Sequence, residues 1–444
     1  MTRIPVLWIL CCAGAALSGA REYPVSDHTL ANGMKIIVQE NHAIPNVALY
    51  LFFRVGSRNE KPGITGISHF LEHMMFNGSK AYGPREFDQV MENNGGSNNA
   101  YTTRDVTVYS DWFSRSALDL VLSMEAERLA NLKFDPGVTE SERNVVLSEW
   151  RTSVENDNSG FLEQELHAAL YRQHPYRWPV LGWERDIRSW TVADLRAYFE
   201  RGYAPNNCVM VAVGDVAADH FVRLAEKYFA PLPRRDPLPP VGPAEPAQHE
   251  ERRVEVDRPA QAPRQVIAYH VPPTADPDYW PMQTVSALLT LGRGSRLYHR
   301  LVRHEKLAVS VSSWLHLSLD PGEFVIDLNL KRHADPAGVD RALDDEMERL
   351  KTTPVPTREL QAARNKLLTA HARAIHTDSG MAEWLGSYAV FFGDYRKLFS
   401  APQAVERVTA QDVQRVTRKY LVAANRTIAT LKPTAGASAR EPAK

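Results

Sequence analysis

A proline-rich segment near the middle of the chain does most to limit how the chain can fold. Residues 231–247 contain seven prolines and almost no apolar periodicity, which is typical of an extended, semi-rigid connector. The chain has 444 residues, which is more than one hydrophobic core usually spans. We therefore expect two domains of similar size, residues 21–230 and 251–435, joined by a linker at 231–250 and followed by a tail at 436–444.

Each half has the same order of predicted elements, with strands first and long amphipathic helices later. In the first half the patterns predict strands at 34–38, 47–55, 97–102, 106–113 and 208–213, and helices at 67–76, 115–132, 139–154, 161–172 and 192–201. A further helix is predicted to start at Pro84 and to end before Gly95. In the second half they predict strands at 265–270, 308–317, 323–330 and 427–431, a helix at 280–291, and further helices up to about residue 420. This order favours an α+β domain that is used twice.

The charges of the chain nearly cancel. There are 52 Lys and Arg residues against 53 Asp and Glu residues, so no excess positive charge is available to attract a polyanion or an anionic membrane surface. The composition, 44% hydrophobic and 24% charged, is that of an ordinary globular protein. Nucleic acid is therefore not an expected partner.

Residues 1–20 have the pattern of a signal peptide. Arg3 precedes an apolar run over residues 4–17, and the small residues at 18–20 suit a cleavage site. The apolar run is shorter than the roughly 20 residues that span a bilayer, and polar residues follow it at once. We expect an exported protein with no membrane span in its mature chain, and an uncleaved anchor is the alternative.

The sequence His69-Phe70-Leu71-Glu72-His73 lies on a predicted helix and can bind a metal ion. Residues four apart project from one helical face, so both imidazoles can reach one ion. Zinc suits imidazole and carboxylate ligands, and a catalytic zinc site normally has three protein ligands and one water. Glu72 neighbours both histidines and can take a proton from that water. The alternative is a surface helix with two solvated histidines, but the apolar residues around the motif favour a buried helix.

The third ligand is expected to be a carboxylate on another element. The predicted helix at 139–154 offers Glu140, Glu142 and Glu149, and the last two lie two helical turns apart on one face. Periodicity does not choose among the three glutamates, and an acidic stripe exposed to solvent would produce the same pattern. The residues by themselves leave the third ligand open.

With these residues the chain resembles the pitrilysin-type (M16) metallopeptidases, the inverted zincins, whose motif is H-x-x-E-H. The resemblance covers about residues 24–432 and extends to the bacterial two-domain branch and to the zinc-bearing beta subunit of mitochondrial processing peptidase. It implies two similar α+β domains, each an antiparallel sheet flanked by helices. It also implies one Zn²⁺ per chain, held by His69, His73 and Glu149, with Glu72 as the general base and Glu142 as a supporting residue.

The stretch from Gly95 to Thr102 resembles the edge strand that lies beside the metal in this family. The resemblance implies that Asn99, Ala100 and Tyr101 bind the substrate. An extended peptide can add to an edge strand through main-chain hydrogen bonds, which does not require one particular sequence.

The second half departs from the family pattern at one place. Many members carry an Arg and a Tyr that hold the carbonyl oxygen of the substrate, and these positions fall on Val302 and Val309. Neither valine can donate a side-chain hydrogen bond. Arg300 and Arg303 lie nearby but would point away from position 302 on a helix, although a one-residue gap would bring Arg303 into register. We therefore predict a heterodimer with a second M16-like subunit that supplies the Arg and Tyr; a homodimer and a clamshell monomer are the alternatives.

The leading interpretation is a zinc endopeptidase of the bacterial periplasm that cleaves extended peptides or unfolded protein segments. One rival is a non-catalytic M16-like subunit with a structural or chaperone-like role, and another is a zinc-stabilised binding protein. A scaffold has no physical need of His69, Glu72, His73 and Glu149 together, and a binding protein would not require Glu72. These residues therefore favour the peptidase.

Overall fold

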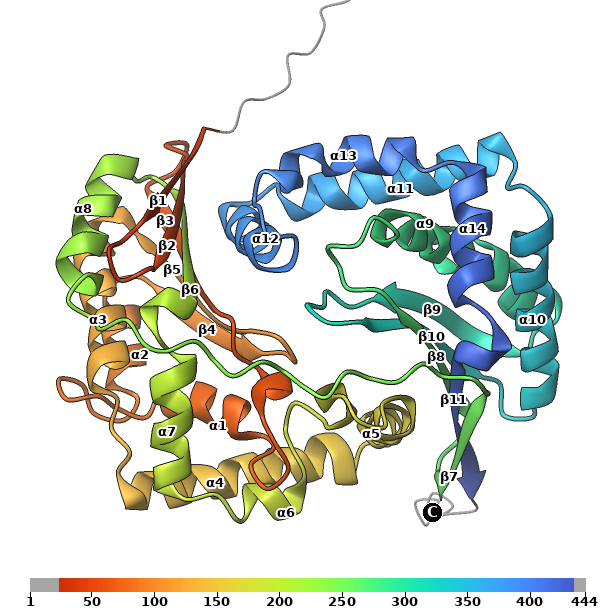
Figure 1. Ribbon diagram of the computed structural model, residues 1–444, viewed down its shortest axis with the longest axis horizontal. Coiled ribbons are helices and arrows are strands. Elements are labelled where there is room, and N and C mark those ends of the chain that lie inside the picture. The colour runs from red at the N-terminus through yellow and green to blue at the C-terminus, as the bar shows by residue number, and fades with distance from the viewer. Residues whose placement is uncertain (1–23, 435–444) are drawn as a thin grey trace, which may run out of the picture.

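The computed structural model describes residues 24–434, which form two β-sheets surrounded by helices (Figure 1). The predicted signal peptide (1–20) and tail (436–444) lie outside the described residues. The first sheet, on the left of Figure 1, has the strand order β1-β2-β6-β3-β5-β4. Its strands are β1 (Val25–Thr29), β2 (Lys35–Glu40), β3 (Asn46–Phe53), β4 (Ser97–Thr102), β5 (Thr107–Ser114) and β6 (Cys208–Gly214).

The second sheet repeats the connectivity of the first. Its strand order is β7-β11-β8-β10-β9. If β1 is left out and the five remaining strands of each half are numbered along the chain, both sheets have the same order, 1-5-2-4-3. The duplicated α+β fold is thereby confirmed. Its strands are β7 (Arg252–Pro259), β8 (Arg264–Val271), β9 (Ala308–Leu315), β10 (Gly322–Leu330) and β11 (Arg426–Thr434).

Neither sheet is purely antiparallel, which corrects the prediction. In each half the first and fifth strands, β2 with β6 and β7 with β11, run parallel, and the other pairs are antiparallel. A parallel pair needs a long crossover, and the helices that precede each fifth strand supply it.

Five α-helices lie between the fourth and the fifth strand of each half. The last of the five, α7 (Val192–Gly202) and α14 (Ala410–Tyr420), both begin with a threonine capping box, formed by Thr191 with Asp194 and by Thr409 with Asp412. The helices of the first half are α1 (Ile67–Met74), α2 (Glu86–Asn93), α3 (Leu118–Asn131), α4 (Pro136–Trp150), α5 (Asn158–Leu170), α6 (Glu184–Ile187), α7 (Val192–Gly202) and α8 (Ala218–Phe229). Those of the second half are α9 (Tyr279–Thr290), α10 (Pro336–Thr352), α11 (Thr357–Ala374), α12 (Asp378–Phe391), α13 (Lys397–Arg407) and α14 (Ala410–Tyr420).

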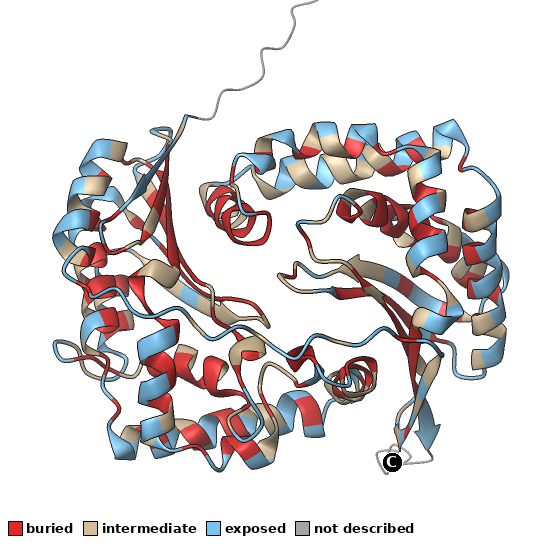
Figure 2. Ribbon diagram, in the orientation of Figure 1, coloured by how far each residue is buried: buried red, intermediate tan, exposed pale blue. Residues whose placement is uncertain are grey.

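Each half contributes one helix to the sheet of the other half. One face of the first sheet packs against helices of its own half, and the opposite face packs against α12. The approach is so close that a Cβ on Gly386 of α12 would lie 2.0 Å from the Phe52 ring. In return, α5 packs against the second sheet through Leu162, Leu166 and Leu170. Both helices carry buried residues (Figure 2), so the two halves share their hydrophobic cores.

Some local features differ from the sequence-based expectations. Strands β1 and β7 were not predicted, because they lie at sheet edges and are largely exposed and therefore lack an apolar pattern. Pro84 precedes α2 instead of lying in its first turn, because Arg85 adopts a left-handed conformation with φ of 61° at the N-cap. Residues 231–250 contain no helix or strand. Within residues 24–434, no helix has the length and apolar character needed to cross a membrane.

Candidate metal centre

Helix α1 turns the predicted motif toward α4. Its apolar face is buried in the core of the first half, so His69, Glu72 and His73 lie on the remaining side. The start of the helix is held by Glu60, whose carboxylate accepts hydrogen bonds from the backbone N–H groups of Gly66 and Ser68 at 2.8 and 2.9 Å. This contact satisfies donors that a helix start otherwise leaves unpaired. The motif is therefore anchored on its buried face and at its N-terminus.

Three of the predicted residues meet at one point between α1 and α4. One ligand atom from each of His69, His73 and Glu149 lies within 4.8 Å of the other two, and no second group of this kind is found in residues 24–434. Nε2 of His69 is 3.7 Å from one carboxylate oxygen of Glu149, and Nε2 of His73 is 3.5 Å from the other. Because Glu149 is 39% exposed, the point can be reached from solvent.

The spacing of these atoms fits a zinc ion better than it fits direct hydrogen bonds. The separations of 3.5 and 3.7 Å are longer than normal hydrogen bonds. Ligand atoms at about 2.1 Å from a tetrahedral zinc ion lie about 3.4 Å from one another. Two imidazoles and one carboxylate are also a known donor set for catalytic zinc, with the fourth position left to water. The side chains of His69, His73 and Glu149 therefore fit this ion.

The other two glutamates of α4 occupy different places. The Oε1 atom of Glu142 lies 2.7 Å from Nδ1 of His73, on the side of the ring opposite the cluster. This contact fixes the ring and directs Nε2 toward Glu149. Glu140 accepts a hydrogen bond from Nε of Arg143 at 3.0 Å and contacts neither histidine. Of the three candidates, only Glu149 lies in the cluster.

The surroundings shift the pKa values of the two histidines in opposite directions. Burial, followed by the neighbouring His73, lowers the pKa of His69 to about 4. Burial alone would also lower the pKa of His73, but its contacts with the Glu142 and Glu149 carboxylates outweigh burial and raise this pKa to about 9. In turn, the His73 imidazole lowers the pKa of both glutamates. The two carboxylates are therefore ionised and favour a cation at this point.

Glu72 lies beside the cluster and is tied to strand β4. Its Oε2 atom accepts a hydrogen bond from Oγ1 of Thr102 at 2.5 Å. Burial raises the pKa of Glu72, and the hydrogen bond from Thr102 opposes this rise. A carboxylate with a raised pKa is a stronger base, which suits proton transfer. Sequence reasoning did not single out Thr102, although alternation along the strand places it on the same face as Ala100.

The predicted substrate-binding residues lie on β4, the strand that contacts Glu72 through Thr102. Asn99, Ala100 and Tyr101 belong to β4, which is the last strand of the first sheet, so one edge of β4 is not paired with a described strand. Asn99 and Tyr101 lie on the face opposite Thr102. The hydroxyl of Tyr101 donates a hydrogen bond of 2.6 Å to Glu383 of α12. The contact of these residues with a substrate stays a prediction.

The two positions at which the family pattern places an Arg and a Tyr carry valines, and the arginines close to them in the sequence are paired elsewhere or exposed. Val302 packs against the core of the second half, and Val309, on the edge strand β9, is 63% exposed. Arg300 is held by an ion pair of 2.7 Å with Glu305, and Arg303 is exposed. Helix α9, which occupies in the second half the place of α1, contains neither His nor Glu. Within the described residues, the candidate metal ligands therefore belong to the first half alone.

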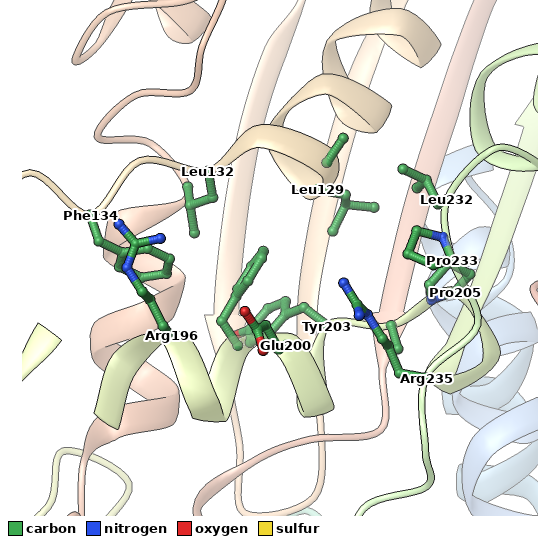
Figure 3. Close-up of a pocket in the computed structure, with 13 residues that line it drawn as sticks. Leu129, Leu132, Phe134, Arg196, Glu200, Tyr203, Pro205, Leu232, Pro233 and Arg235 are labelled. Carbon is green, nitrogen blue, oxygen red and sulfur yellow. The ribbon is translucent and has the colours of Figure 1, made fainter. Parts of the chain in front are cut away.

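A separate pocket of about 170 Å³ lies between α3, α7 and the linker (Figure 3). Its wall combines apolar and charged side chains, and its lining includes Leu129, Phe134, Arg196, Glu200, Tyr203, Leu232 and Arg235. None of these residues belongs to the cluster or to β4, so this pocket is not the candidate metal centre.

The duplicated fold, with a cluster of metal-ligating side chains in one half, is the arrangement of a two-domain M16 protein. Residues 35–183 match the family model described as insulinase (peptidase family M16), and residues 189–367 match the one described as peptidase M16 inactive domain. The chain belongs to the M16 peptidase family.

Individual relatives agree with this assignment. The chain is 27% identical to the zinc protease PqqE of Helicobacter pylori over 430 residues, which cover 96% of this chain and 97% of the relative. It is 28% identical to the beta subunit of the mitochondrial-processing peptidase of Blastocladiella emersonii, over 88% of this chain and 85% of that subunit. The crystal structure of a protease from Helicobacter pylori superposes with a TM-score of 0.89 at 27% identity, covering 93% of this chain and 100% of that one.

Proposed function

We propose that this chain is a zinc-dependent endopeptidase whose nucleophile is a water molecule activated by Glu72. The observation that carries the proposal is the meeting of His69, His73 and Glu149 at one point, with Glu72 beside them and tied to the edge strand β4. Membership of the M16 family and relatives that are named zinc proteases support the same chemistry.

Each residue of the centre has a distinct task in this mechanism. His69, His73 and Glu149 would hold the ion, and Glu142 keeps the His73 ring oriented. When bound, zinc polarises the carbonyl group of the scissile peptide and lowers the pKa of the attacking water to about 7. Glu72 takes a proton from that water and passes it to the leaving amine. The hydroxyl of Thr102 keeps the Glu72 carboxylate in place during both transfers.

The free edge of β4 is the proposed binding site for an extended peptide. A substrate segment would add to it as a further strand, with main-chain hydrogen bonds to the stretch that contains Asn99, Ala100 and Tyr101. Because Thr102 follows directly in the same strand and contacts Glu72, a peptide on this edge lies next to the general base. Binding of this kind suits unfolded segments, since folded proteins seldom present a free extended backbone.

We further propose that a second M16-like subunit completes the active site. The second half of this chain has Val302 and Val309 where the family pattern places hydrogen-bond donors, and donors to a developing oxyanion are worth orders of magnitude in rate. One relative is by its name a subunit of a processing peptidase, which supports a paired arrangement. We also propose export to the periplasm, on the strength of the apolar segment at residues 4–17.

The proposal is tested by zinc analysis combined with peptide cleavage. The purified protein should contain one zinc ion per chain by mass spectrometry. Glu72→Gln should keep the zinc and, in the presence of an M16-like subunit that carries the Arg and Tyr, lose about 10²- to 10⁴-fold in the cleavage of a quenched fluorescent peptide. Glu140→Gln, an exposed change on α4, is the matched control and should keep full activity.

Three outcomes would decide against parts of this account. Bound zinc with unchanged activity in Glu72→Gln would overturn the mechanism. Full activity of the isolated chain would overturn the need for a partner. Bound zinc without any cleavage, even with a co-expressed M16-like subunit that carries the Arg and Tyr, would favour a non-catalytic subunit.

A further inference from the structure

The turn between β4 and β5 is held by charged residues of the second half. Arg104 lies in this turn, and its Nη1 atom donates a hydrogen bond of 2.5 Å to Glu323 of β10. The second arm of the guanidinium lies 2.6 Å from Nε2 of His167 on α5, and the hydroxyl of Tyr171 donates to the other oxygen of Glu323 at 2.5 Å. Glu323 is 1% exposed, so this contact is not a loose surface pair.

A second ion pair crosses between the halves at the same turn. Asp105 is buried and accepts hydrogen bonds of 2.7 and 2.9 Å from the hydroxyl of Tyr176. Arg58 lies between two carboxylates, with Nε 3.2 Å from Asp105 and Nη1 2.6 Å from Asp320, the latter in the loop before β10. Both charged residues of the turn are therefore engaged in networks that reach the second half.

The backbone on the other side of the turn is also fixed. The N–H groups of Ser57 and Arg58 donate to the carbonyl oxygens of Thr103 and Arg104 at 3.2 and 2.9 Å. Gly56 lies so close that a Cβ at this position would be 2.5 Å from the carbonyl oxygen of Thr103. The turn is thus held between the segment 56–58 of the first half and β10 of the second.

This turn directly adjoins the residue that contacts the general base. Thr102, which hydrogen-bonds Glu72, is the last residue of β4 and precedes the turn by one position. A shift of the turn would therefore move Thr102 and the peptide-binding edge relative to Glu72, which lies on the anchored helix α1. A misplacement of about 1 Å in an active site can lower the rate by about 10²-fold.

We propose that Arg104 and Glu323 are positioning residues, which place the edge strand β4 and the Glu72 carboxylate correctly only while the two halves are in contact. The proposal rests on the proposed peptidase function. The new element is that peptide cleavage by the first half depends on an ion pair with the second half, although the described residues of the second half supply no candidate metal ligand. Loss of this ion pair would release the turn and lower activity without loss of the metal-ligating residues.

A matched pair of substitutions separates positioning from general destabilisation. Arg104→Lys keeps the charge but loses the two-armed contact with Glu323 and His167. Arg264→Lys is the control, because Arg264 forms a partly buried ion pair with Asp327 between two strands of the second sheet, away from the turn. We expect Arg104→Lys to lower kcat at least tenfold, with KM changed less, and Arg264→Lys to leave kcat within twofold of the unaltered protein.

A second readout does not depend on catalysis. In Arg104→Lys, amide hydrogen exchange over residues 97–107 should become at least about tenfold faster, while zinc content and the exchange of α1 stay unchanged. If Arg104→Lys does not fold, Tyr171→Phe serves as the second variant, because it removes one hydrogen bond to Glu323 and leaves every charge in place. The expected fall in kcat is then about threefold.

The possible results separate this proposal from the peptidase function. Equal kcat losses in Arg104→Lys and Arg264→Lys, or unchanged exchange over residues 97–107, would overturn the positioning role even if the protein is an active peptidase. Faster exchange confined to this stretch, in a protein that cleaves no peptide, would support the coupling of the halves while the peptidase function itself fails.

Discussion

Removal of the Glu142 carboxylate should weaken zinc binding without removing a ligand. Oε1 of Glu142 lies 2.7 Å from Nδ1 of His73, and its side chain is only 15% exposed, so water replaces this contact poorly. Loss of such a supporting hydrogen bond typically lowers metal affinity 10- to 100-fold. At about 1.36 kcal/mol per factor of ten, this range corresponds to about 1.4 to 2.7 kcal/mol. We therefore expect Glu142→Leu to raise the zinc Kd by about 10- to 100-fold.

The affinity is measured by competition with a chromophoric zinc chelator at neutral pH. Glu140→Leu is the matched control, because Glu140 lies two residues earlier on the same helix but pairs with Arg143 instead of a histidine. Its zinc Kd should stay within about twofold of the unaltered protein. Equal affinities of Glu142→Leu and the unaltered protein, or equal losses in both variants, would show that the contact with His73 does not support the metal.

Two further predictions concern the first half. Thr102→Val removes the hydroxyl that donates to Glu72 and should lower kcat about 10- to 100-fold. Thr102→Ser keeps a hydroxyl and should keep most of the activity. Equal kcat values for the two variants would refute the role of the Thr102 hydroxyl. Asp111 of β5 and Glu125 of α3 are both buried. Burial, and then the neighbouring Glu125, raise the pKa of Asp111 well above its usual value, so Asp111 keeps its proton in the fold to a higher pH than in the unfolded chain. Its contribution to stability is thus complete below about pH 4 and is lost as the pH rises toward the folded pKa. Urea unfolding from pH 4 upward should show a steeper fall in stability for the unaltered protein than for Asp111→Asn, and parallel pH profiles would contradict the shift.

The repeated order of strands and helices was readable from the sequence because it depends on local patterns. The β-rich run at 47–55 marks the strand β3, and the helical periodicity around the His69 motif reports which residues share a face. Two of the edge strands escaped detection for the same reason. β1 and β7 lie at the rims of their sheets and bury few residues, so no apolar pattern marks them.

The sequence by itself determined that His69, Glu72 and His73 project from one helix, because four residues make about one helical turn. It did not determine which glutamate of α4 meets them; the family spacing pointed to Glu149, and the packing of α4 against α1 brings that side chain within reach. Only the tertiary structure decided that α5 packs against the second sheet and α12 against the first. The same holds for the contact of Arg104 with Glu323, 219 residues further along the chain. Periodicity shows which residues share a face, but the partner of that face is set by packing between distant segments, which no local pattern encodes.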